Sequence, residues 1–308
     1  MSRRRGGTPI HGWLIIDKPL GVTSAGVVGK VRRLTGAAKV GHGGTLDPLA
    51  TGVLPLALGE ATKTVAYAMD GTKIYRFTIR WGEATATDDA EGEITARSDV
   101  RPDEARIQAV LPTFIGTIEQ VPPIYSAVKV EGQRAYALAR AEQPVTLEPR
   151  QVRIDDFRLI GRPDADHAEF EVKAGKGAYM RSLARDLALA LGTVGHVSAL
   201  RRIAVGPFHE KDAISLENLM TLGHSAPLSK YLLPVETALD DIPALALTEA
   251  EGCSLRQGRA VPALPVMTRS ASAELGQGVV VCAMAGGRPV ALAQIRGAEI
   301  RPLRILNL

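Results

Sequence analysis

The chain has 308 residues, of which 45% are hydrophobic and 23% charged, and its formal net charge is +4. These values are typical of a globular protein with a sizeable core, and no apolar stretch approaches the roughly 20 residues of a membrane span. The N-terminus lacks the hydrophobic segment of a signal peptide, so we expect a cytoplasmic protein. Cys253 and Cys282 are far apart and form no CxxC motif, and the histidines show no metal-binding spacing, so neither a metal site nor a disulfide framework is expected.

Basic residues are concentrated near the N-terminus. Between Met1 and Leu46 the sequence contains eight lysines and arginines but a single acidic residue, Asp17. A basic edge of this kind suits the phosphate backbone of a nucleic acid, although a solubilising surface would give the same pattern. For the N-terminal Arg3-Arg4-Arg5 run alone, the solubilising interpretation is favoured.

The first elements predicted along the chain are a strand, a turn and a helix. Gly12 to Asp17 is predicted as a short buried strand, followed by a turn at Lys18-Pro19-Leu20-Gly21. Thr23 or Ser24 can cap the helix that follows. The helical spacing of its apolar residues predicts a buried stripe of Val27, Val28, Val31 and Leu34.

The next segment, GHGGTLDPLATGVLPLALG from Gly41 to Gly59, is centred on Asp47, the only acidic residue between Asp17 and Glu60. Pro48 disfavours a helical conformation at Asp47, and the surrounding glycines allow turns and close approach of another molecule. We interpret Asp47 as a catalytic carboxylate presented from a loop ahead of an apolar strand, Val53 to Leu58. The alternative is a turn aspartate that accepts hydrogen bonds from nearby amides.

The middle of the chain mixes strands and helices without a regular βαβ repeat. The alternation in Lys73 to Trp81 predicts a strand with Tyr75, Phe77, Ile79 and Trp81 on one face. An acidic turn is predicted at 85–92, and a further strand at 168–174. Helices are predicted at about 61–69, 102–111, 135–140 and 180–191, with short strand-like pieces between 115 and 153.

The composition changes after Leu239, where Pro, Ala and Gly become frequent. Strand-like segments at 278–284, 288–295 and 303–306 predict a small β-rich domain. We therefore expect an α+β protein with a large mixed-sheet domain at 1–240 and a second domain at 241–308.

Six stretches together resemble the TruB family of tRNA pseudouridine synthases. They occur in the family's order and cover about the first two-thirds of the chain. The matching stretches are GWLIIDKPLGVTS (12–24), GHGGTLDPLATG (41–52), KIYRF (73–77), PPIYSAVK (122–129), GKGAYMR (175–181) and LRR (200–202).

This resemblance implies isomerisation of uridine to pseudouridine at position 55, in the TΨC loop of tRNA. It implies a mainly antiparallel sheet with flanking helices, a tRNA-binding insertion around 103–153 and a small C-terminal PUA-like RNA-binding domain. No cofactor, metal or guide RNA is implied, and we expect a monomer whose partner is the TΨC stem-loop of tRNA.

The resemblance also implies roles for individual residues. Asp47 corresponds to the catalytic aspartate, Tyr75 to the tyrosine that stacks on the target base and helps remove the C5 proton, and Arg181 to the arginine that pairs with the aspartate. The residues expected to bind the substrate are His42, which fills the gap left by the flipped base, Tyr179 and Leu200, which line the base pocket, and Lys18.

The chemistry of the reaction agrees with these residue types. A uridine in a folded loop must leave its stack before its glycosidic bond can be reached, so an aromatic or apolar slot is needed. An aspartate with an ordinary pKa of about 3.9 is ionised at neutral pH, and an adjacent arginine keeps it ionised after desolvation. Attack on C6, attack on C1′ and removal of the C2′ proton to give a glycal all remain open.

One departure from the family pattern lies in the predicted acidic turn. Ala86 occupies a position where many relatives carry an acid, and we expect Asp89 to provide the main polar contacts of this turn.

Two other functions stay open from the residues alone. One is an N-glycosidase acting on nucleic acid, which would usually need a second carboxylate. The other is a tRNA-binding or folding protein without essential chemistry.

Overall fold

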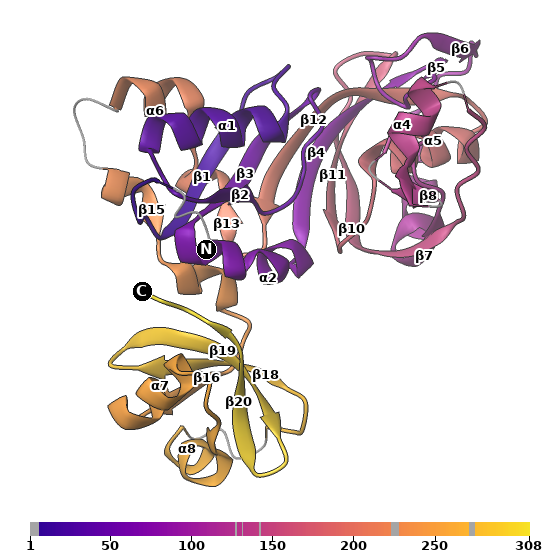
Figure 1. Cartoon of the computed structure of the whole chain (residues 1–308). Helices are drawn as coiled ribbons and strands as arrows, with labels where there is room; N and C mark the ends of the chain where they lie inside the picture. The colour runs from indigo at the N-terminus through magenta and orange to yellow at the C-terminus, as the bar shows by residue number, and fades with distance from the viewer. Residues whose placement is uncertain (1–5, 127, 131, 142, 223–227, 271–274) are drawn as a thin grey trace.

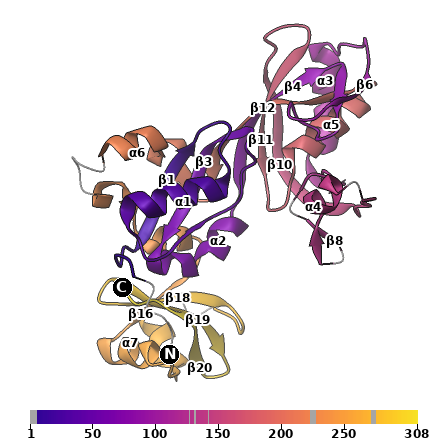
Figure 2. The ribbon, with the colours of Figure 1, turned by 45° about the horizontal axis from the view of Figure 1, so that its top comes forward.

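The computed structural model describes residues 6–126, 128–130, 132–141, 143–222, 228–270 and 275–308 (Figure 1). It has the predicted α+β fold, with a large mixed sheet flanked by helices and a smaller β-rich domain at the C-terminus. The two parts are also distinct in a second view, where the C-terminal domain again lies beyond α2 (Val65–Asp70) (Figure 2).

Within these residues, eleven strands form the large sheet. The main strand order is β14 (Ile214–Ser215), β1 (Gly12–Lys18), β3 (Ala50–Leu58), β12 (Gly195–Val205), β4 (Lys73–Trp81), β11 (His167–Ala174), β10 (Arg150–Gly161) and β7 (Gly116–Gln120). Three short strands pair beside this path, namely β2 (Val40–His42) with β3, β13 (Phe208–His209) with β12, and β15 (Leu232–Leu233) with β1. The β1–β14 and β3–β12 pairs are parallel, and the other pairs are antiparallel.

The α-helices around this sheet are α1 (Ser24–Thr35), α2 (Val65–Asp70), α3 (Glu104–Val110), α4 (Ala135–Arg140), α5 (Met180–Ala190) and α6 (Leu216–Leu222). The 3₁₀ helices are η1 (Gly59–Lys63), η2 (Leu111–Phe114), η3 (Glu210–Asp212), η4 (Leu228–Tyr231) and η5 (Val235–Leu239). Two separate hairpins pair β5 (Glu83–Thr85) with β6 (Ile94–Arg97), and β8 (Lys129–Val130) with β9 (Gln133–Arg134).

The C-terminal sheet has the order β16 (Ala244–Leu247), β18 (Val280–Ala285), β19 (Arg288–Arg296), β20 (Glu299–Ile305) and β17 (Val261–Pro262). It carries α7 (Glu249–Arg256) and α8 (Ala263–Arg269). Composition had predicted only strands here. The Thr248 and Glu251 side chains form a capping box at the start of α7, and this short signal marks that helix in the sequence.

The two halves of the large sheet are covered differently, and their sequences show why. In β1 the run Trp13 to Ile16 is buried on both faces. Leu14 and Ile16 pack beneath α1, while Trp13 and Ile15 pack against Phe208 and η5. In β4 the buried residues alternate and pack against α5, whereas Arg76 and Arg80 lie exposed on the opposite face. One half is therefore covered on both faces and the other on a single face.

Two long strands were not predicted from the sequence, and both contain irregular pairing. β12 shifts register against β4 between Val197 and Ala199 and again between Arg202 and Ala204. β10 shifts register against β11 between Ile154 and Asp156. Because such bulges break the two-residue alternation, the pattern that identified β4 is absent from these strands.

Two smaller predictions were wrong. Leu34 is 43% exposed, so the buried stripe of α1 ends at Val31. The single helix predicted at 61–69 is divided at Thr64 into η1 and α2.

Among the residues that the structure describes, no helix has both the length and the apolar character that crossing a membrane requires.

The C-terminal domain is connected to the large domain twice. The first connection follows η5, which ends at Leu239, and residues 240–243 separate η5 from β16. We predicted the domain boundary at residue 240. The end of the chain then returns to the large domain, where Leu306 is 1% exposed and packs in the cluster that contains Trp13 and Phe208. Lys63 Nζ donates to the Ile305 carbonyl at 2.7 Å, and the Asn307 amide donates to Glu60 Oε2 at 2.8 Å.

Leu306→Ala should therefore destabilise the protein, because removing a buried leucine side chain typically costs about 2–5 kcal/mol. Leu308→Ala is the matched control, since Leu308 is 45% exposed and its loss should change the unfolding free energy by less than about 0.5 kcal/mol. Urea denaturation of the two variants measures the difference. Equal stability of both variants would show that the returning tail contributes nothing to docking.

Candidate active site

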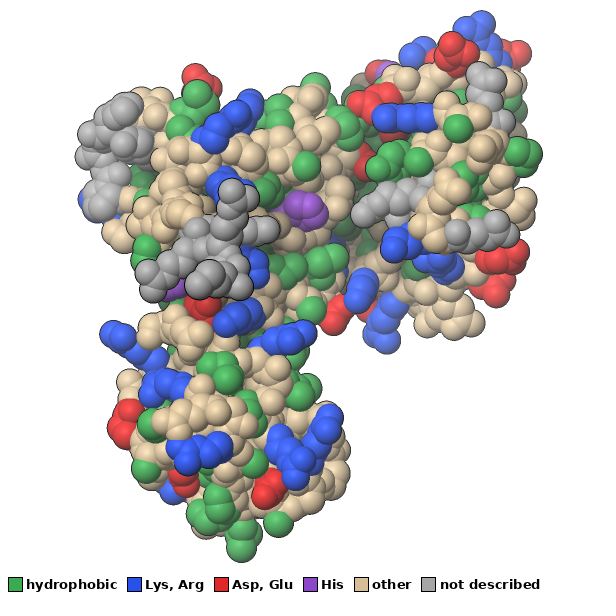
Figure 3. All heavy atoms as spheres, viewed as in Figure 1, with side chains coloured by type: hydrophobic (Ala, Val, Ile, Leu, Met, Phe, Trp, Pro, Cys, Tyr) green, Lys and Arg blue, Asp and Glu red, His purple; other side chains and the backbone are tan. Residues whose placement is uncertain are grey.

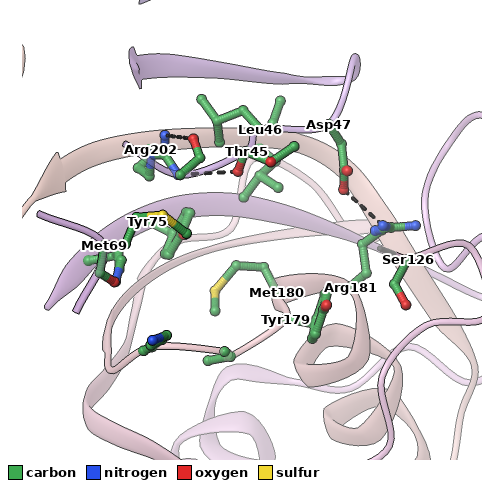
Figure 4. A pocket seen from close by; sticks show the side chains of 17 residues that line it. Thr45, Leu46, Asp47, Met69, Tyr75, Ser126, Tyr179, Met180, Arg181 and Arg202 are labelled. Carbon is green, nitrogen blue, oxygen red and sulfur yellow. Dashed lines mark hydrogen bonds and ion pairs between the residues drawn. The ribbon is translucent and has the colours of Figure 1, made fainter. Parts of the chain in front are cut away.

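A pocket of about 350 Å³ lies where the loop before β3, the strands β4 and β12, and the start of α5 meet (Figure 4). Its volume lies at the lower end of the range of small-molecule sites. Five of the predicted site residues line it, namely Asp47, Tyr75, Tyr179, Arg181 and Leu200. The other lining residues are Gly44, Thr45, Leu46, Ala50, Met69, Lys73, Ser126, Lys176, Gly177, Ala178, Met180 and Arg202.

Asp47 reaches this pocket from an irregular loop directly before β3, as its sequence predicts. Its Oδ2 lies 2.8 Å from Nη2 of Arg181, the ion pair drawn in Figure 4. The side chain of Asp47 is 43% exposed, whereas that of Arg181 is only 7% exposed. The arginine is thus the buried member of the pair, and the carboxylate stays open to a ligand in the pocket.

Arg181 has three further partners. Its Nη1 donates to the Thr87 carbonyl at 3.0 Å and lies 3.4 Å from Oδ2 of Asp89, whose side chain is 3% exposed. Its Nη2 also donates to the Tyr125 carbonyl at 2.9 Å. A buried guanidinium with two carboxylates and two carbonyls is well compensated for its lost hydration. These contacts fix the direction from which Arg181 meets Asp47.

The turn at 85–92 supports this arrangement from behind. Asp89 Oδ1 accepts hydrogen bonds from the Thr87 hydroxyl, at 2.5 Å, and from the Glu91 amide, at 3.0 Å. Asp88 adopts a positive φ of 59° and pairs with Arg185 at 2.9 Å. Burial raises the pKa of Asp88, and the charge of Arg185 opposes that rise. Asp89 therefore makes the polar contacts expected of this turn, despite Ala86.

Arg202 was not chosen from the sequence as a site residue, yet it lies beneath both Asp47 and Tyr75. Its side chain is fully buried and donates to the carbonyls of Val53, Gly44 and Thr45 at 2.8, 3.1 and 3.4 Å. Burial lowers the pKa of the guanidinium, and the nearby Tyr75 phenol opposes this shift. Arg202 belongs to the LRR stretch (200–202) that resembles the family, but that resemblance was used for Leu200 alone.

Close packing at Arg202 also explains one glycine. Gly52 has a φ of 96°, and a Cβ at this position would lie 2.2 Å from the Arg202 carbonyl oxygen. A larger residue at Gly52 would therefore separate β3 from β12 at the edge of the pocket.

Lys18 lies next to the Asp47 loop but does not line the pocket. It is fully buried, and its ammonium group donates to the carbonyls of Val22, Pro19 and Pro48 at 2.7, 3.0 and 3.2 Å. An ammonium group has three protons, so direct contact with a substrate would require one of these bonds to break. The geometry gives Lys18 a supporting position under Pro48, and its contact with a substrate stays a prediction.

His42 also lies outside the residues that line the pocket. It ends β2, pairs with Leu56 of β3, and is half-buried. Its Nδ1 is buried without a hydrogen-bond partner, and burial, reinforced by the charge of Arg202, lowers the pKa of the ring. A neutral imidazole suits apolar contact with a neighbouring base better than a charged imidazole does.

Among the described residues, no group of three or more His, Cys, Asp or Glu side chains could hold a metal ion.

Lys73 adds a third buried cation at the pocket wall, after Arg181 and Arg202. Its side chain is 8% exposed and donates to the carbonyls of Met69 and Gly71, the latter at 2.6 Å. Burial lowers its pKa to about 8 from 10.5, and the nearby charge of Arg202 acts in the same direction. These bonds hold the end of α2, so that Met69 closes one side of the pocket.

The sequence matches two family descriptions in succession. Residues 32–180 match the TruB family pseudouridylate synthase (N terminal domain), and residues 181–240 match the tRNA pseudouridylate synthase B C-terminal domain. The chain is 60% identical to tRNA pseudouridine synthase B of Rhodospirillum rubrum, over 100% of both chains. It is 57% identical to the protein of the same name from Gluconacetobacter diazotrophicus, over 99% of this chain and 100% of that one.

A solved structure with the same fold is described as the crystal structure of a Cbf5-Nop10-Gar1 complex. The TM-score is 0.74 at 26% sequence identity, and the match covers 96% of this chain and 85% of that chain. The likeness extends beyond residue 240, where the two family descriptions end.

The lowered pKa of Lys73 predicts how stability depends on pH. Between about pH 8 and 10.5 the unfolded chain keeps Lys73 protonated while the folded protein releases its proton, so the unfolding free energy should rise with pH. We expect the parent to gain stability relative to Lys73→Met between pH 7.5 and 9.5, measured by urea denaturation at constant ionic strength. Lys176→Met, which removes an exposed lysine of the same pocket, controls for overall charge. A parent–Lys73→Met difference that stays constant over this range would contradict the prediction.

Proposed function

Because the chain belongs to the TruB family of tRNA pseudouridine synthases, and is therefore an isomerase, we propose that it acts on uridine 55 in the TΨC loop of tRNA. The observation that carries this proposal is the ion pair of 2.8 Å between Asp47 and Arg181 inside a pocket of suitable size for a pyrimidine. Identity of 60% over the full length of a relative named tRNA pseudouridine synthase B supports it.

The reaction conserves every atom of the nucleotide. The bond between C1′ and N1 breaks, the base turns, a bond forms between C1′ and C5, and the proton on C5 is replaced by one on N1. No oxidant, reductant or second substrate is needed for this balance. The protein must supply a carboxylate, a group that accepts the C5 proton and a pocket in which the base can turn.

Asp47 is the group we propose for the carboxylate step. Arg181 holds Oδ2 in an ion pair at the pocket wall, while the exposed part of Asp47 leaves room for approach to the nucleotide. Attack on C6, attack on C1′ and abstraction of the C2′ proton each require an ionised carboxylate at this point. The pocket geometry is compatible with all three.

Tyr75 is proposed to stack on the flipped uracil and to accept the C5 proton. It lines the pocket from β4, and stacking between a base and an aromatic ring typically contributes about 1–3 kcal/mol. The buried guanidinium of Arg202 lies near its phenol, and this positive charge would stabilise negative charge developing on the Tyr75 oxygen. Leu200 and Tyr179 complete the slot. We propose that His42 fills the space the base leaves in the loop.

The remainder of the tRNA needs surfaces beyond the pocket. We propose that the insertion around 103–153 and the C-terminal domain bind its backbone. Arginine side chains lie across the visible face of the C-terminal domain (Figure 3). Exposed arginines there are Arg256, Arg259, Arg269, Arg288, Arg296, Arg301 and Arg304. On this proposal the protein acts in the cytoplasm as a monomer and without a guide RNA.

An N-glycosidase remains the alternative with a specific observation behind it, because Arg181 brings Asp89 within the same cluster as Asp47. A hydrolase would need the second carboxylate to activate water or protonate the leaving base. Asp89 is 3% exposed, with its oxygens occupied by Thr87, Glu91 and Arg181. These contacts favour a supporting role for Asp89, and therefore isomerisation over hydrolysis.

Asp47→Asn tests the proposal directly. The amide keeps the size of the side chain but removes the negative charge, so we expect no pseudouridine at position 55 while tRNA affinity stays within about threefold. Incubation with unmodified tRNA, followed by mapping of pseudouridine at single-nucleotide resolution and assay of free uracil, measures the outcome.

Asp156→Asn provides the matched control, because Asp156 is 48% exposed beside Arg158 and distant from the residues that line the pocket. It should keep full activity. Pseudouridine made by Asp47→Asn at a substantial fraction of the parental rate would refute the role of Asp47. Free uracil released by the parent would instead support the glycosidase.

Tyr75→Phe separates stacking from proton transfer. The ring remains, so tRNA should still bind, but turnover should fall by at least about a hundredfold because the proposed proton acceptor is lost. Tyr67→Phe removes a phenol that does not line this pocket and should remain active. Single-turnover rates at saturating tRNA give the comparison. A near-parental rate for Tyr75→Phe would leave that residue as a stacking platform only.

A further inference from the structure

Tyr179 lies at a position where a small backbone shift would matter. It is the N-cap residue of α5, two residues before Arg181, and its side chain lines the pocket. Most N-caps are fixed by their own side chain, but Tyr179 makes no such hydrogen bond. Another part of the chain must therefore hold its backbone.

Gln120 provides that contact. Its Oε1 accepts a hydrogen bond from the Tyr179 amide at 2.8 Å, and its Nε2 donates to the Tyr179 carbonyl at 3.1 Å. The side chain is 2% exposed, so both bonds are shielded from water. A carboxamide that pairs with both the N–H and the C=O of one residue restrains the two peptide groups that flank it, and so restricts the φ and ψ rotations of Tyr179.

Gln120 also marks the point where the segment 121–149, which is part of the proposed insertion around 103–153, leaves the sheet. It is the last residue of β7 and pairs directly with Arg150, the first residue of β10, so residues 121–149 depart and return at a single cross-strand pair. Figure 1 shows α4 and β8, which belong to this excursion, on the same side of the molecule as α5. Beyond Gln120, the Val121 carbonyl accepts bonds from Ser182 Oγ at 2.8 Å and from Arg185 Nη2 at 3.0 Å.

We infer that Gln120 is a positioning residue for the isomerisation, acting through Tyr179 by setting the base pocket at the root of the insertion. This inference rests on the proposed function. A displaced Tyr179 would move both the pocket wall and the start of α5 that carries Arg181. Misplacement of a catalytic group by about 1 Å can cost a hundredfold in rate, whereas contacts with the RNA backbone elsewhere would be unaffected.

Gln120→Met tests the inference, since methionine has a similar length but cannot pair with either backbone group. We expect tRNA affinity within about threefold of the parent and a fall in kcat of about a hundredfold. Ser182→Ala is the matched control. It removes a buried hydrogen bond between α5 and the same segment, but the Val121 carbonyl keeps its bond from Arg185. This control should retain kcat within about threefold.

Gln120→Glu gives a second readout through pH. A carboxylate still accepts from the Tyr179 amide but repels the Tyr179 carbonyl, whereas a protonated carboxyl can donate to that carbonyl as glutamine does. Burial favours the protonated form. The activity of Gln120→Glu relative to the parent should therefore rise at least tenfold as the pH is lowered from 8.5 to 6. Thermal unfolding measured at each pH confirms that both proteins remain folded.

Three outcomes would overturn the inference: a folded Gln120→Met variant with near-parental kcat, a loss confined to tRNA affinity, or an equal loss in Ser182→Ala. If Gln120→Met does not fold, a pH-independent activity ratio for Gln120→Glu would overturn it instead. The parent protein separates this result from the proposed function. If the parent makes no pseudouridine at position 55, the proposed function itself has failed.

Discussion

The buried guanidinium of Arg181 is the contact on which the site depends. One side chain joins Asp47 from the loop before β3, Asp89 and the Thr87 carbonyl from the turn after β5, and the Tyr125 carbonyl from the segment between β7 and β8. Removing a partner from such a cluster would leave charge or polar atoms unpaired away from water, which is far more costly than losing an exposed ion pair. The three segments are consequently held in one arrangement.

The loop that carries Asp47 is held by donors from other elements. Arg202 binds the Gly44 and Thr45 carbonyls, and Lys18 binds the Pro48 carbonyl. Ser24 both accepts from the Leu46 amide at 2.8 Å and donates to its carbonyl at 3.0 Å. Buried backbone groups outside regular structure need such partners. Because these bonds go to the backbone, the Asp47 side chain remains available to the pocket.

The position of the pocket follows from the two kinds of sheet surface. β1 and β3 are covered on both faces and form a rigid base, while β4 has one buried face toward α5. β12 joins the two halves by pairing in parallel with β3 and antiparallel with β4. Residues from both halves, such as Asp47 and Tyr75, can therefore face one another across a cavity without any single strand carrying both.

The sequence by itself determined the α+β class, the regular strands β1 and β4, helix α5 and the loop position of Asp47, because these depend on local periodicity, glycine and proline. Its motifs also identified the family. Only the tertiary structure decided that Arg202 and Gln120 support the site, that Lys18 lies under the loop, and that Asp89 shares Arg181 with Asp47. Those contacts join residues 30 to 158 positions apart, and the bulges in β10 and β12 remove the alternation that would have located their strands. No local pattern encodes which distant carbonyl a buried cation will meet.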